Sequence, residues 1–263
     1  MTPYDFRNRT VLITGASLGI GASFARALSA RGAHLVLVAR NEARLSALAK
    51  ELGRAHVIPA DLTTPDAPQR LFDDVRARGL TIDVLINNAG FGVHGPFADV
   101  PLPTHLEQID LNVRALVALT HLFMPMLEAQ RGGVIQVASL AGHQPSPFFS
   151  TYGATKAFVL AFTAALWAEY EPRGVRVLAL SPGATETAFF QRAGNVPGAE
   201  TRASPNHVAQ LGLTAFAAGR PAAIHGAGNR ALVTLSRLFS REFSARTMAR
   251  MMRRSPPPAL PGT

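Results

Sequence analysis

The sequence predicts a three-layer α/β fold in which a doubly wound parallel sheet carries helices on both faces, and three observations favour this class. Short apolar runs alternate with longer segments of helical period, as in repeated strand–helix–strand units. The runs are nearly continuous in Val, Ile and Leu, which is typical of strands buried on both faces. A glycine-rich stretch, Thr14–Gly21, directly follows the first run. The 263 residues, 48% of them hydrophobic, exclude wholesale disorder and suit one large domain.

The alternation defines the expected elements in chain order. Strands are expected at Thr10–Thr14, His34–Ala39, His56–Pro59, Val84–Ile86, Val134–Val137 and Val175–Leu180. Helices are expected at Ile20–Arg31, Glu42–Leu52, Pro68–Arg78, Pro103–Ala129 and Thr151–Tyr170. Pro125 lies inside the fourth helical segment and predicts a kink or break there. In open parallel sheets ligands bind beyond the carboxyl ends of the strands, so the loops after the strands are where a site is expected.

Composition narrows the function classes. The chain has no Cys, which excludes disulfides and thiolate metal sites and fits a reducing, cytoplasmic location. No secretory leader and no bilayer-spanning segment is recognisable, and we expect no metal site. The formal net charge is +9, and of the 26 basic residues only Lys50 and Lys156 are Lys. The Arg bias is best explained by genome composition, but it makes each remaining Lys a candidate for a role that Arg cannot fill.

The loop after the first strand has the features of a phosphate-binding loop. Its glycines allow a tight turn and a close backbone approach to a pyrophosphate, and the following helix presents free N–H groups to the anion. A glycine-rich loop alone is weak support, but here it lies between a strand and a helix, as the motif requires. The predicted cofactor residues in this loop are Gly15, Ser17, Leu18, Gly19, Ile20 and Gly21.

The ends of the second and third strands indicate which dinucleotide is bound. Arg40 stands where such folds place the residue that meets the adenosine ribose, and an Arg there suits a 2′-phosphate. Arg44, one helical turn later, could assist, although an ordinary solvated Arg40 remains an alternative. Asp61, with the following Leu62, is expected either to accept from the adenine amino group or to be a helix N-cap.

A Tyr and a Lys four residues apart form the candidate catalytic pair. Tyr152 and Lys156 would lie on one face of a helix that follows the fifth strand, which ends at Ser139. A phenol with a pKa of about 10 exchanges protons poorly near neutral pH unless its anion is stabilised. A neighbouring ammonium lowers that pKa. One of only two lysines therefore stands beside one of only three tyrosines.

Taken together, these motifs identify the chain as a member of the short-chain dehydrogenase/reductase superfamily, of the ordinary single-domain type with a Rossmann fold. The resemblance covers about residues 8–190. It is carried by Thr14-Gly-x-x-x-Gly19-x-Gly21, Asn87-Asn-Ala-Gly90, Asn112, Ser139, Tyr152-x-x-x-Lys156, Pro182-Gly183 and Thr187.

The resemblance implies a role for each matching position. Tyr152 would be the general acid in ketone reduction and the base in alcohol oxidation, and Ser139 would hydrogen-bond the substrate oxygen. Lys156 would bind the nicotinamide ribose and lower the Tyr152 pKa. Asn112 would hold a water that links Lys156 to solvent, although an Asn at a helix kink is the simpler interpretation. The remaining cofactor contacts would come from Asn88, Ala89, Gly90, Pro182, Gly183, Thr185 and Thr187.

Aromatic residues in the presumed pocket loops favour a bulky apolar carbonyl substrate. Four of the 15 Phe residues stand in two adjacent pairs, 148–149 and 189–190. Packing of lid onto core, or against a subunit, explains these Phe residues equally well. The predicted substrate-binding residues are His94, Gln144, Phe149 and Phe189, and Phe91 belongs to the same loops.

The C-terminus departs from the family pattern and divides the chain. We expect a catalytic domain at 1–228, a basic amphipathic helical extension at 229–254 and a disordered tail at 255–263. Residues 220–263 hold eight Arg against the single acid Glu242, a net charge of +7. Packing against the substrate lid or a subunit partner is the favoured role of the extension, and a membrane-surface helix is the alternative. No nucleic-acid motif accompanies the charge.

The sequence therefore predicts an NADP(H)-dependent oxidoreductase, with NADP(H) preferred over NAD(H), that reduces a hydrophobic ketone, 3-oxoacyl or steroid-like carbonyl. A homodimer or homotetramer is expected from the resemblance. The alternatives are a catalytically silent NADP-binding scaffold or sensor, and a peripheral membrane reductase anchored by its C-terminal helix.

Overall fold

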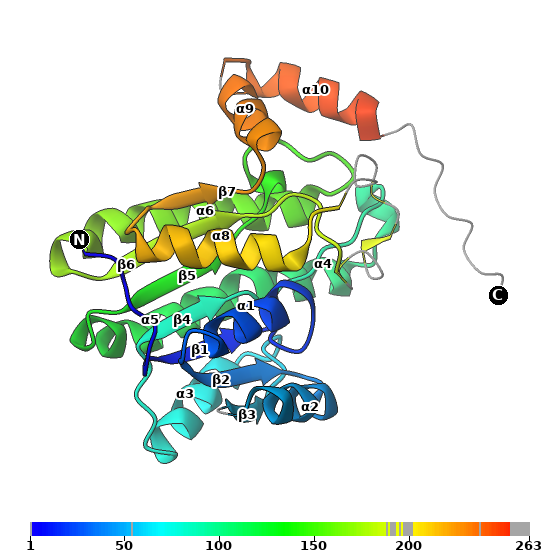
Figure 1. The fold of residues 1–263 in the computed structure, drawn as a ribbon. Helices are drawn as coiled ribbons and strands as arrows, with labels where there is room; N and C mark the ends of the chain where they lie inside the picture. The colour runs from blue at the N-terminus through cyan, green and yellow to red at the C-terminus, as the bar shows by residue number, and fades with distance from the viewer. Residues whose placement is uncertain are drawn as a thin grey trace.

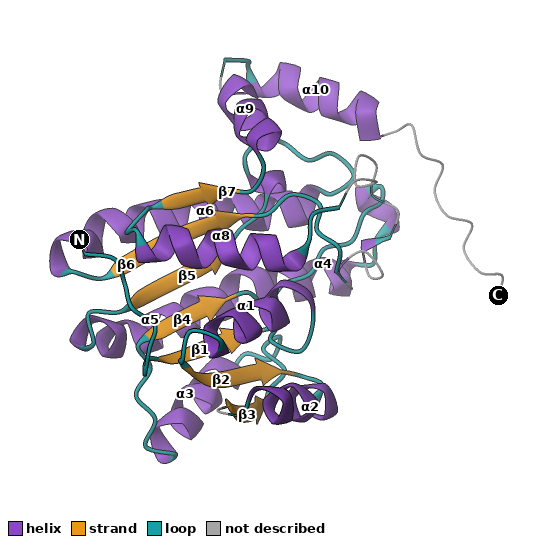
Figure 2. Ribbon diagram, viewed as in Figure 1, coloured by secondary structure: helices purple, strands orange, loops and turns teal. Residues whose placement is uncertain are grey.

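Seven parallel strands form one sheet in the order β3-β2-β1-β4-β5-β6-β7 (Figures 1 and 2). The computed structural model describes residues 2–53, 55–187, 189, 193, 194, 196, 202–236 and 238–252. The strands are β1 (Thr10–Thr14), β2 (His34–Ala39), β3 (Ala55–Pro59), β4 (Val84–Asn87), β5 (Gly133–Val137), β6 (Arg176–Ser181) and β7 (Ala222–Ile224). The predicted doubly wound α/β class is confirmed.

Helices cover both faces of this sheet, and each face has its own apolar core. They are α1 (Gly19–Ser29), α2 (Glu42–Leu52), α3 (Ala67–Ala77), α4 (Leu102–Ile109), α5 (Leu116–Ala129), α6 (Ser150–Tyr170), α8 (Pro205–Ala217), α9 (Ala227–Ser236) and α10 (Arg241–Met252). One core joins the sheet to α1, α2 and α8, and the other joins it to α3, α5 and α6. Strands buried between two cores explain their continuous apolar sequences.

The predicted elements recur with small shifts at their ends, but three features differ. The six predicted strands and five helical segments are present, whereas β7 and α8 were not predicted. The segment 103–129 is not broken at Pro125, since α5 runs through that residue. Its irregularity lies at the π-helical stretch Asp110–Ala115, which joins α4 to α5. Such π-turns often stand at functional sites, and this one contains Asn112.

The strand order creates the crevice in which a ligand can bind. The chain first moves from β1 outward to β3 and then returns to β4, which pairs with β1 on its other side. The loops after β1 and β4 therefore leave the sheet side by side at its carboxyl edge. This reversal is where doubly wound folds bind dinucleotides, so the topology brings the glycine-rich loop next to Asn87–Gly90.

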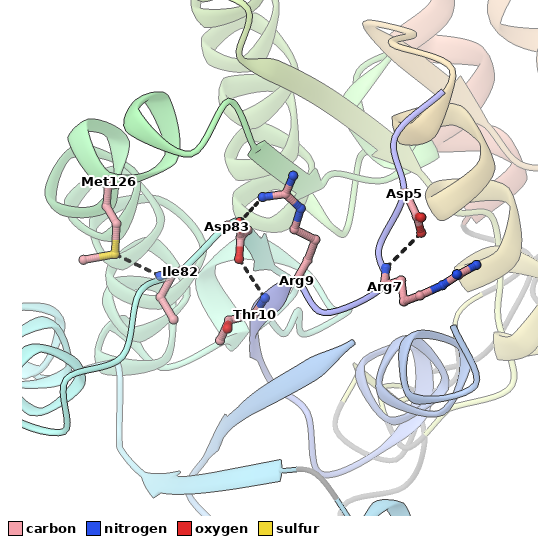
Figure 3. A network of polar contacts seen from close by, with 7 residues as sticks. All are labelled: Asp5, Arg7, Arg9, Thr10, Ile82, Asp83 and Met126. Carbon is pink, nitrogen blue, oxygen red and sulfur yellow. Dashed lines mark hydrogen bonds and ion pairs between the residues drawn. The ribbon is translucent and has the colours of Figure 1, made fainter. Parts of the chain in front are cut away.

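At the amino ends of the strands, opposite the crevice, a polar network around Asp83 joins β1 to β4 (Figure 3). Asp83 accepts from Arg9 Nη1 at 2.7 Å and from the backbone N–H of Thr10 at 2.8 Å. The neighbouring Ile82 N–H donates to Met126 Sδ at 3.0 Å, which ties the start of β4 to α5. These bonds fix the amino ends of β1 and β4, and so support the loops at the other end.

The last two helices stand apart from the layered body, beyond the carboxyl end of β7 (Figure 1). The amphipathic pattern expected at 229–254 forms two helices, α9 and α10. None of the described helices combines the length and apolarity that crossing a membrane requires. The tail expected to be disordered, 255–263, lies outside the described residues.

Candidate active site

The glycine-rich loop is tightly folded against its neighbours. Gly15 has a φ of +66°, a conformation that favours glycine. A Cβ on Gly21 would stand 2.2 Å from the Gly15 carbonyl oxygen, and one on Gly19 would stand 2.7 Å from Thr187 Cγ2. Side chains are thus excluded from the turn itself. The result is a bare backbone cradle of the kind that a pyrophosphate can approach closely.

The start of α1 completes the cradle. Leu18 is the N-cap residue, and no side chain caps the helix. The first amides of a helix have no partner inside it, so they are available to an anion, and the helix dipole adds a partial positive charge. Backbone and helix together fit the phosphates of a dinucleotide.

Thr14 and Asn88 join the glycine-rich loop to the loop after β4. The Thr14 hydroxyl accepts from the N–H groups of Asn88 and Ala89, each at 3.0 Å. The Asn88 amide donates to the carbonyl oxygens of Thr14 at 2.9 Å and Gly15 at 3.2 Å. Sequence reasoning quoted Thr14 as part of a motif but gave its side chain no role. In the structure Thr14 sets the distance between the two loops.

Tyr152, Lys156 and Ser139 meet at the floor of a cavity. Tyr152 and Lys156 are both buried on the first half of α6, and Lys156 Nζ lies 5.8 Å from the centre of the Tyr152 ring. Lys156 Nζ also donates to the Val137 carbonyl oxygen at 2.8 Å. Ser139, directly after β5, hydrogen-bonds Tyr152 and accepts from the Ala141 N–H at 3.2 Å. The arrangement places two hydroxyls beside one buried cation.

Burial controls the proton affinities of this pair. It raises the pKa of Tyr152 to about 12, although the hydrogen bond with Ser139 works in the other direction. Burial also lowers the pKa of Lys156 to about 8. The sequence-based expectation that Lys156 lowers the Tyr152 pKa is not met: the pKa is raised, and the neighbour that lowers it is Ser139. The phenol stays protonated at neutral pH, which suits a proton donor.

Asn112 is fully buried in the π-helical stretch and is held by its neighbours. Its Oδ1 accepts from the Phe91 N–H at 3.1 Å, and its Nδ2 donates to Phe91 O at 2.9 Å and Thr155 Oγ1 at 3.1 Å. A Cβ on Gly90 would come within 3.3 Å of both Asn112 Oδ1 and Lys156 Nζ. Asn112 thus fixes the loop after β4, and its role in a water relay stays a prediction.

A cavity of about 1080 Å³ extends from the glycine-rich loop past Tyr152. Most of the residues predicted for the site line it. From the cofactor set these are Gly15, Leu18, Gly19, Ile20, Asn88, Ala89, Gly90, Tyr152, Lys156, Pro182, Gly183, Thr185 and Thr187. From the substrate set they are Gln144, Phe149 and Phe189. Phe149 and Phe189 pack on the Tyr152 ring, with centres 4.5 and 5.3 Å away.

Other predicted residues lie away from this cavity wall. His94 is not part of it; the ring packs near Phe148 and Phe149, and burial lowers its pKa. Ser17, Gly21, Arg40, Arg44, Asp61 and Leu62 are also outside the lining. The Leu62 side chain is buried in the core beneath α3, so it packs rather than facing a ligand. Phe190 lies outside the described residues.

Arg40 and Asp61 face each other at the carboxyl ends of β2 and β3. Arg40 Nη1 lies 3.9 Å from Asp61 Oδ2, and the Arg40 side chain is 60% exposed. Asp61 does not cap α3, whose N-cap is Asp66; its Oδ1 accepts from the Thr63 N–H at 3.1 Å and the Thr63 hydroxyl at 2.7 Å. The exposed guanidinium at this position fits a ribose 2′-phosphate.

Sequence reasoning missed one whole wall of the cavity. Residues of α9 and α10, from Asn229 to Met252, line the same cavity as the catalytic pair. Their helical spacing of apolar residues was recognised, but nothing local in the sequence indicates which surface they face.

Comparisons with known proteins identify the family of this chain. Residues 9–196 match the family model described as short chain dehydrogenase. A serine 3-dehydrogenase of Agrobacterium fabrum (strain C58 / ATCC 33970) is 37% identical over 182 residues, which are 68% of this chain and 73% of the relative.

Two solved structures extend the likeness further along the chain. A 7β-hydroxysteroid dehydrogenase, studied for its stereoselectivity, superposes with a TM-score of 0.83 at 28% identity, covering 95% of this chain and 100% of that one. A short-chain dehydrogenase from Sphingobium yanoikuyae in complex with NADPH superposes with a TM-score of 0.79 at 32% identity, covering 96% and 100%.

The glycine cradle, Ser139, Tyr152 and Lys156 all lie within the residues that match the family model. The chain belongs to the short chain dehydrogenase family and is an oxidoreductase that acts on alcohol and carbonyl groups with a nicotinamide cofactor.

Proposed function

We propose that this protein is an NADP(H)-dependent reductase of a bulky, hydrophobic carbonyl compound. One observation carries the proposal: Ser139, Tyr152 and Lys156 meet at the floor of a cavity whose side walls carry Phe149, Phe189 and further apolar side chains. An apolar wall with a few convergent polar groups binds an apolar ligand and orients its one reactive polar atom.

The chain's own residues perform orientation and proton transfer. The nicotinamide, when bound, supplies the hydride. The hydroxyls of Ser139 and Tyr152 would both donate to the substrate oxygen, which fixes the carbonyl and stabilises the negative charge that develops on it. Tyr152 then gives its proton to that oxygen. Because burial raises its pKa to about 12, the phenol is protonated and so able to donate at neutral pH.

Lys156 and Asn112 support this step. The Lys156 ammonium, held by Val137 O, would hydrogen-bond the ribose and offset the charge that remains on Tyr152 after proton transfer. Asn112 holds the backbone of Phe91 and with it the loop that bounds the site.

The preference for NADP(H) rests on Arg40. Its exposed guanidinium stands at the end of β2, where a 2′-phosphate would give a charge-assisted, bidentate contact. Asp61 lies within 3.9 Å, so the phosphate would share the guanidinium with this carboxylate.

A homo-oligomer is part of the proposal. Large apolar side chains stay exposed on the adjacent helices α4 and α6, namely Leu102, Leu106, Ile109 and Phe158. Exposed apolar patches of this kind mark contacts between proteins. Light scattering of the purified protein would give the subunit number and so decide between a dimer and a tetramer.

A carbonyl panel tests the proposed activity. Purified protein is mixed with NADPH or NADH and with bulky aryl ketones, 3-oxoacyl thioesters and small polar aldehydes, and cofactor oxidation is followed by absorbance. We expect turnover of the bulky apolar carbonyls, with NADPH preferred. Tight NADPH binding without turnover of any carbonyl would contradict this and favour the silent scaffold or sensor.

A further inference from the structure

We propose that α9 and α10 form the outer wall of the substrate site and select carbonyl compounds with a large apolar body. This inference rests on the proposed reductase activity, because it concerns the same cavity. It assigns to the basic C-terminal extension a role in substrate selection, and it names Phe243 and Met248 as specificity-determining residues.

The cavity wall itself carries the inference. Beyond the catalytic residues the cavity continues along the extension, whose apolar lining side chains are Leu232, Leu235, Phe239, Phe243, Met248 and Met251. These residues recur at helical spacing, so each helix turns one apolar face to the cavity. The same cavity therefore has the proton donor at one side and an apolar wall at the other.

The lining side chains are incompletely packed against the protein. Phe243 is 55% exposed and Met251 is 59% exposed, although both face the cavity. Phe239 and Phe243 stack on each other at 5.1 Å, which leaves their outer faces available. Apolar surface left open in this way gains free energy when an apolar ligand covers it. Met side chains can adapt to the shape of such a ligand.

The arginines of the extension point elsewhere. None of the four in its described part, Arg230, Arg241, Arg246 and Arg250, lines the cavity. On α10, Arg246 lies about half a helical turn from the face that contains Ser244 and Met248. A helix lying on a membrane would turn its apolar face outward to lipid. Here residues of that face line the cavity that also contains Tyr152, which favours a substrate as its occupant.

Two contacts set the position of this wall relative to the catalytic residues. Asn229 Nδ2, at the start of α9, donates to His225 O at 2.8 Å and stands 2.8 Å from where a Cβ on Gly183 would lie. Gln144 Nε2 contacts Met248 Sδ at 3.5 Å. Gly183 and Gln144 themselves line the cavity, so the extension is placed against the floor at one end and the loop after β5 at the other.

The chemistry of the wall defines the substrate class. Its polar groups are the side-chain amide of Asn229 and the hydroxyls of Ser236, Ser244 and Thr247, and no charged side chain of the described extension joins them. The cavity of about 1080 Å³ includes the glycine-rich loop, so a bound dinucleotide and the substrate would share this volume. The body of the substrate is therefore uncharged and apolar where it meets the extension.

A ketone series with one reacting group and a growing body tests this wall. The probes are cyclohexanone, 4-tert-butylcyclohexanone and 4-phenylcyclohexanone, reduced with NADPH by the full-length protein. In the wild type we expect kcat/KM to rise with the size of the substituent. In the double variant Phe243→Ala with Met248→Ala, the ratio of kcat/KM for the phenyl compound to that for cyclohexanone should fall about tenfold or more.

Matched controls separate a binding wall from a general disturbance. Leu238→Ala removes an apolar side chain that is 78% exposed and outside the cavity lining, and Arg246→Ala removes a charge from the outer face. Neither should change the ratio. An unchanged ratio in the double variant, or an equal fall in Leu238→Ala, would overturn the inference.

The remaining outcomes are also decisive. If the wild type turns over no carbonyl in the series or the panel, the proposed activity fails, and the inference fails with it. If the wild type sediments with anionic vesicles and the double variant does not, while the ratio is unchanged, the extension is a membrane anchor and the inference is wrong.

Discussion

The two walls of the active-site cavity are built in different ways. The wall from the family core is held by buried, paired polar groups: Asn112 and Lys156 each make short hydrogen bonds to the backbone. The wall from α9 and α10 buries only Val233 in its described part, and its large apolar side chains stay open. Reacting atoms need fixed positions, whereas the shape of the substrate body can vary. We therefore expect the chemical step to depend on the core wall and the selection of substrates to depend on α9 and α10.

The largest effect is expected when the proton donor of the core wall is removed. Tyr152→Phe removes the proton donor while keeping the ring that Phe149 and Phe189 pack on. We expect kcat for ketone reduction to fall about a thousandfold, with NADPH affinity within about twofold of wild type. Stopped-flow turnover and NADPH fluorescence titration measure both. Activity close to wild type would remove Tyr152 from its proposed role.

A stability comparison sharpens the same contrast. Phe123, on α5, is fully buried between α3 and the sheet, whereas Phe243 is half exposed to the cavity. Phe123→Ala should lower the free energy of unfolding by about 3–5 kcal/mol, and Phe243→Ala by less than about 1 kcal/mol. Urea denaturation gives both values. Equal losses would mean that the extension is part of the cooperative core.

The next effect concerns cofactor choice at the far end of the core wall. Arg40→Asp replaces the cation proposed to meet the 2′-phosphate with an anion that repels it. We expect the Kd for NADPH to rise at least about tenfold while that for NADH changes little. Calorimetric titration of both cofactors tests this. The same loss for both cofactors would point to damage of the loop instead.

The smallest effect is a pH dependence set by burial of Lys156. Its folded pKa, about 8, lies below the ordinary value of 10.5, so between these values the unfolded chain binds more protons. Stability of the cofactor-free protein should rise with pH from about 8 to about 10, by at most about 1.4 kcal/mol per pH unit. Above pH 10 the raised pKa of Tyr152 reverses the sign.

Urea denaturation across this pH range measures the slope, and the variant Lys156→Met is the control that should flatten it. If wild type and variant keep the same slope, other groups cause the dependence.

The catalytic half was well predictable because its motifs are local. Each motif can be interpreted from a single strand end or helical turn: the glycines, the Asn pair and the Tyr–Lys spacing. The misses have physical reasons. The strand β7 has three residues, too few for a pattern, and α8 mixes Pro205, His207 and Gly212 with its apolar residues. Asn112, in the π-helical stretch, pairs with Phe91, 21 positions earlier, and no local pattern records that contact.

The sequence by itself determined the fold class and the family and predicted the reacting side chains, because strand–helix alternation and catalytic spacing are short-range patterns. The tertiary structure decided the proton affinities, since burial rather than charge dominates the pKa of Tyr152. It also decided that His94 lies outside the cavity wall and that the extension lies inside it. Both depend on which distant surfaces meet when the chain folds, and no local spacing records that.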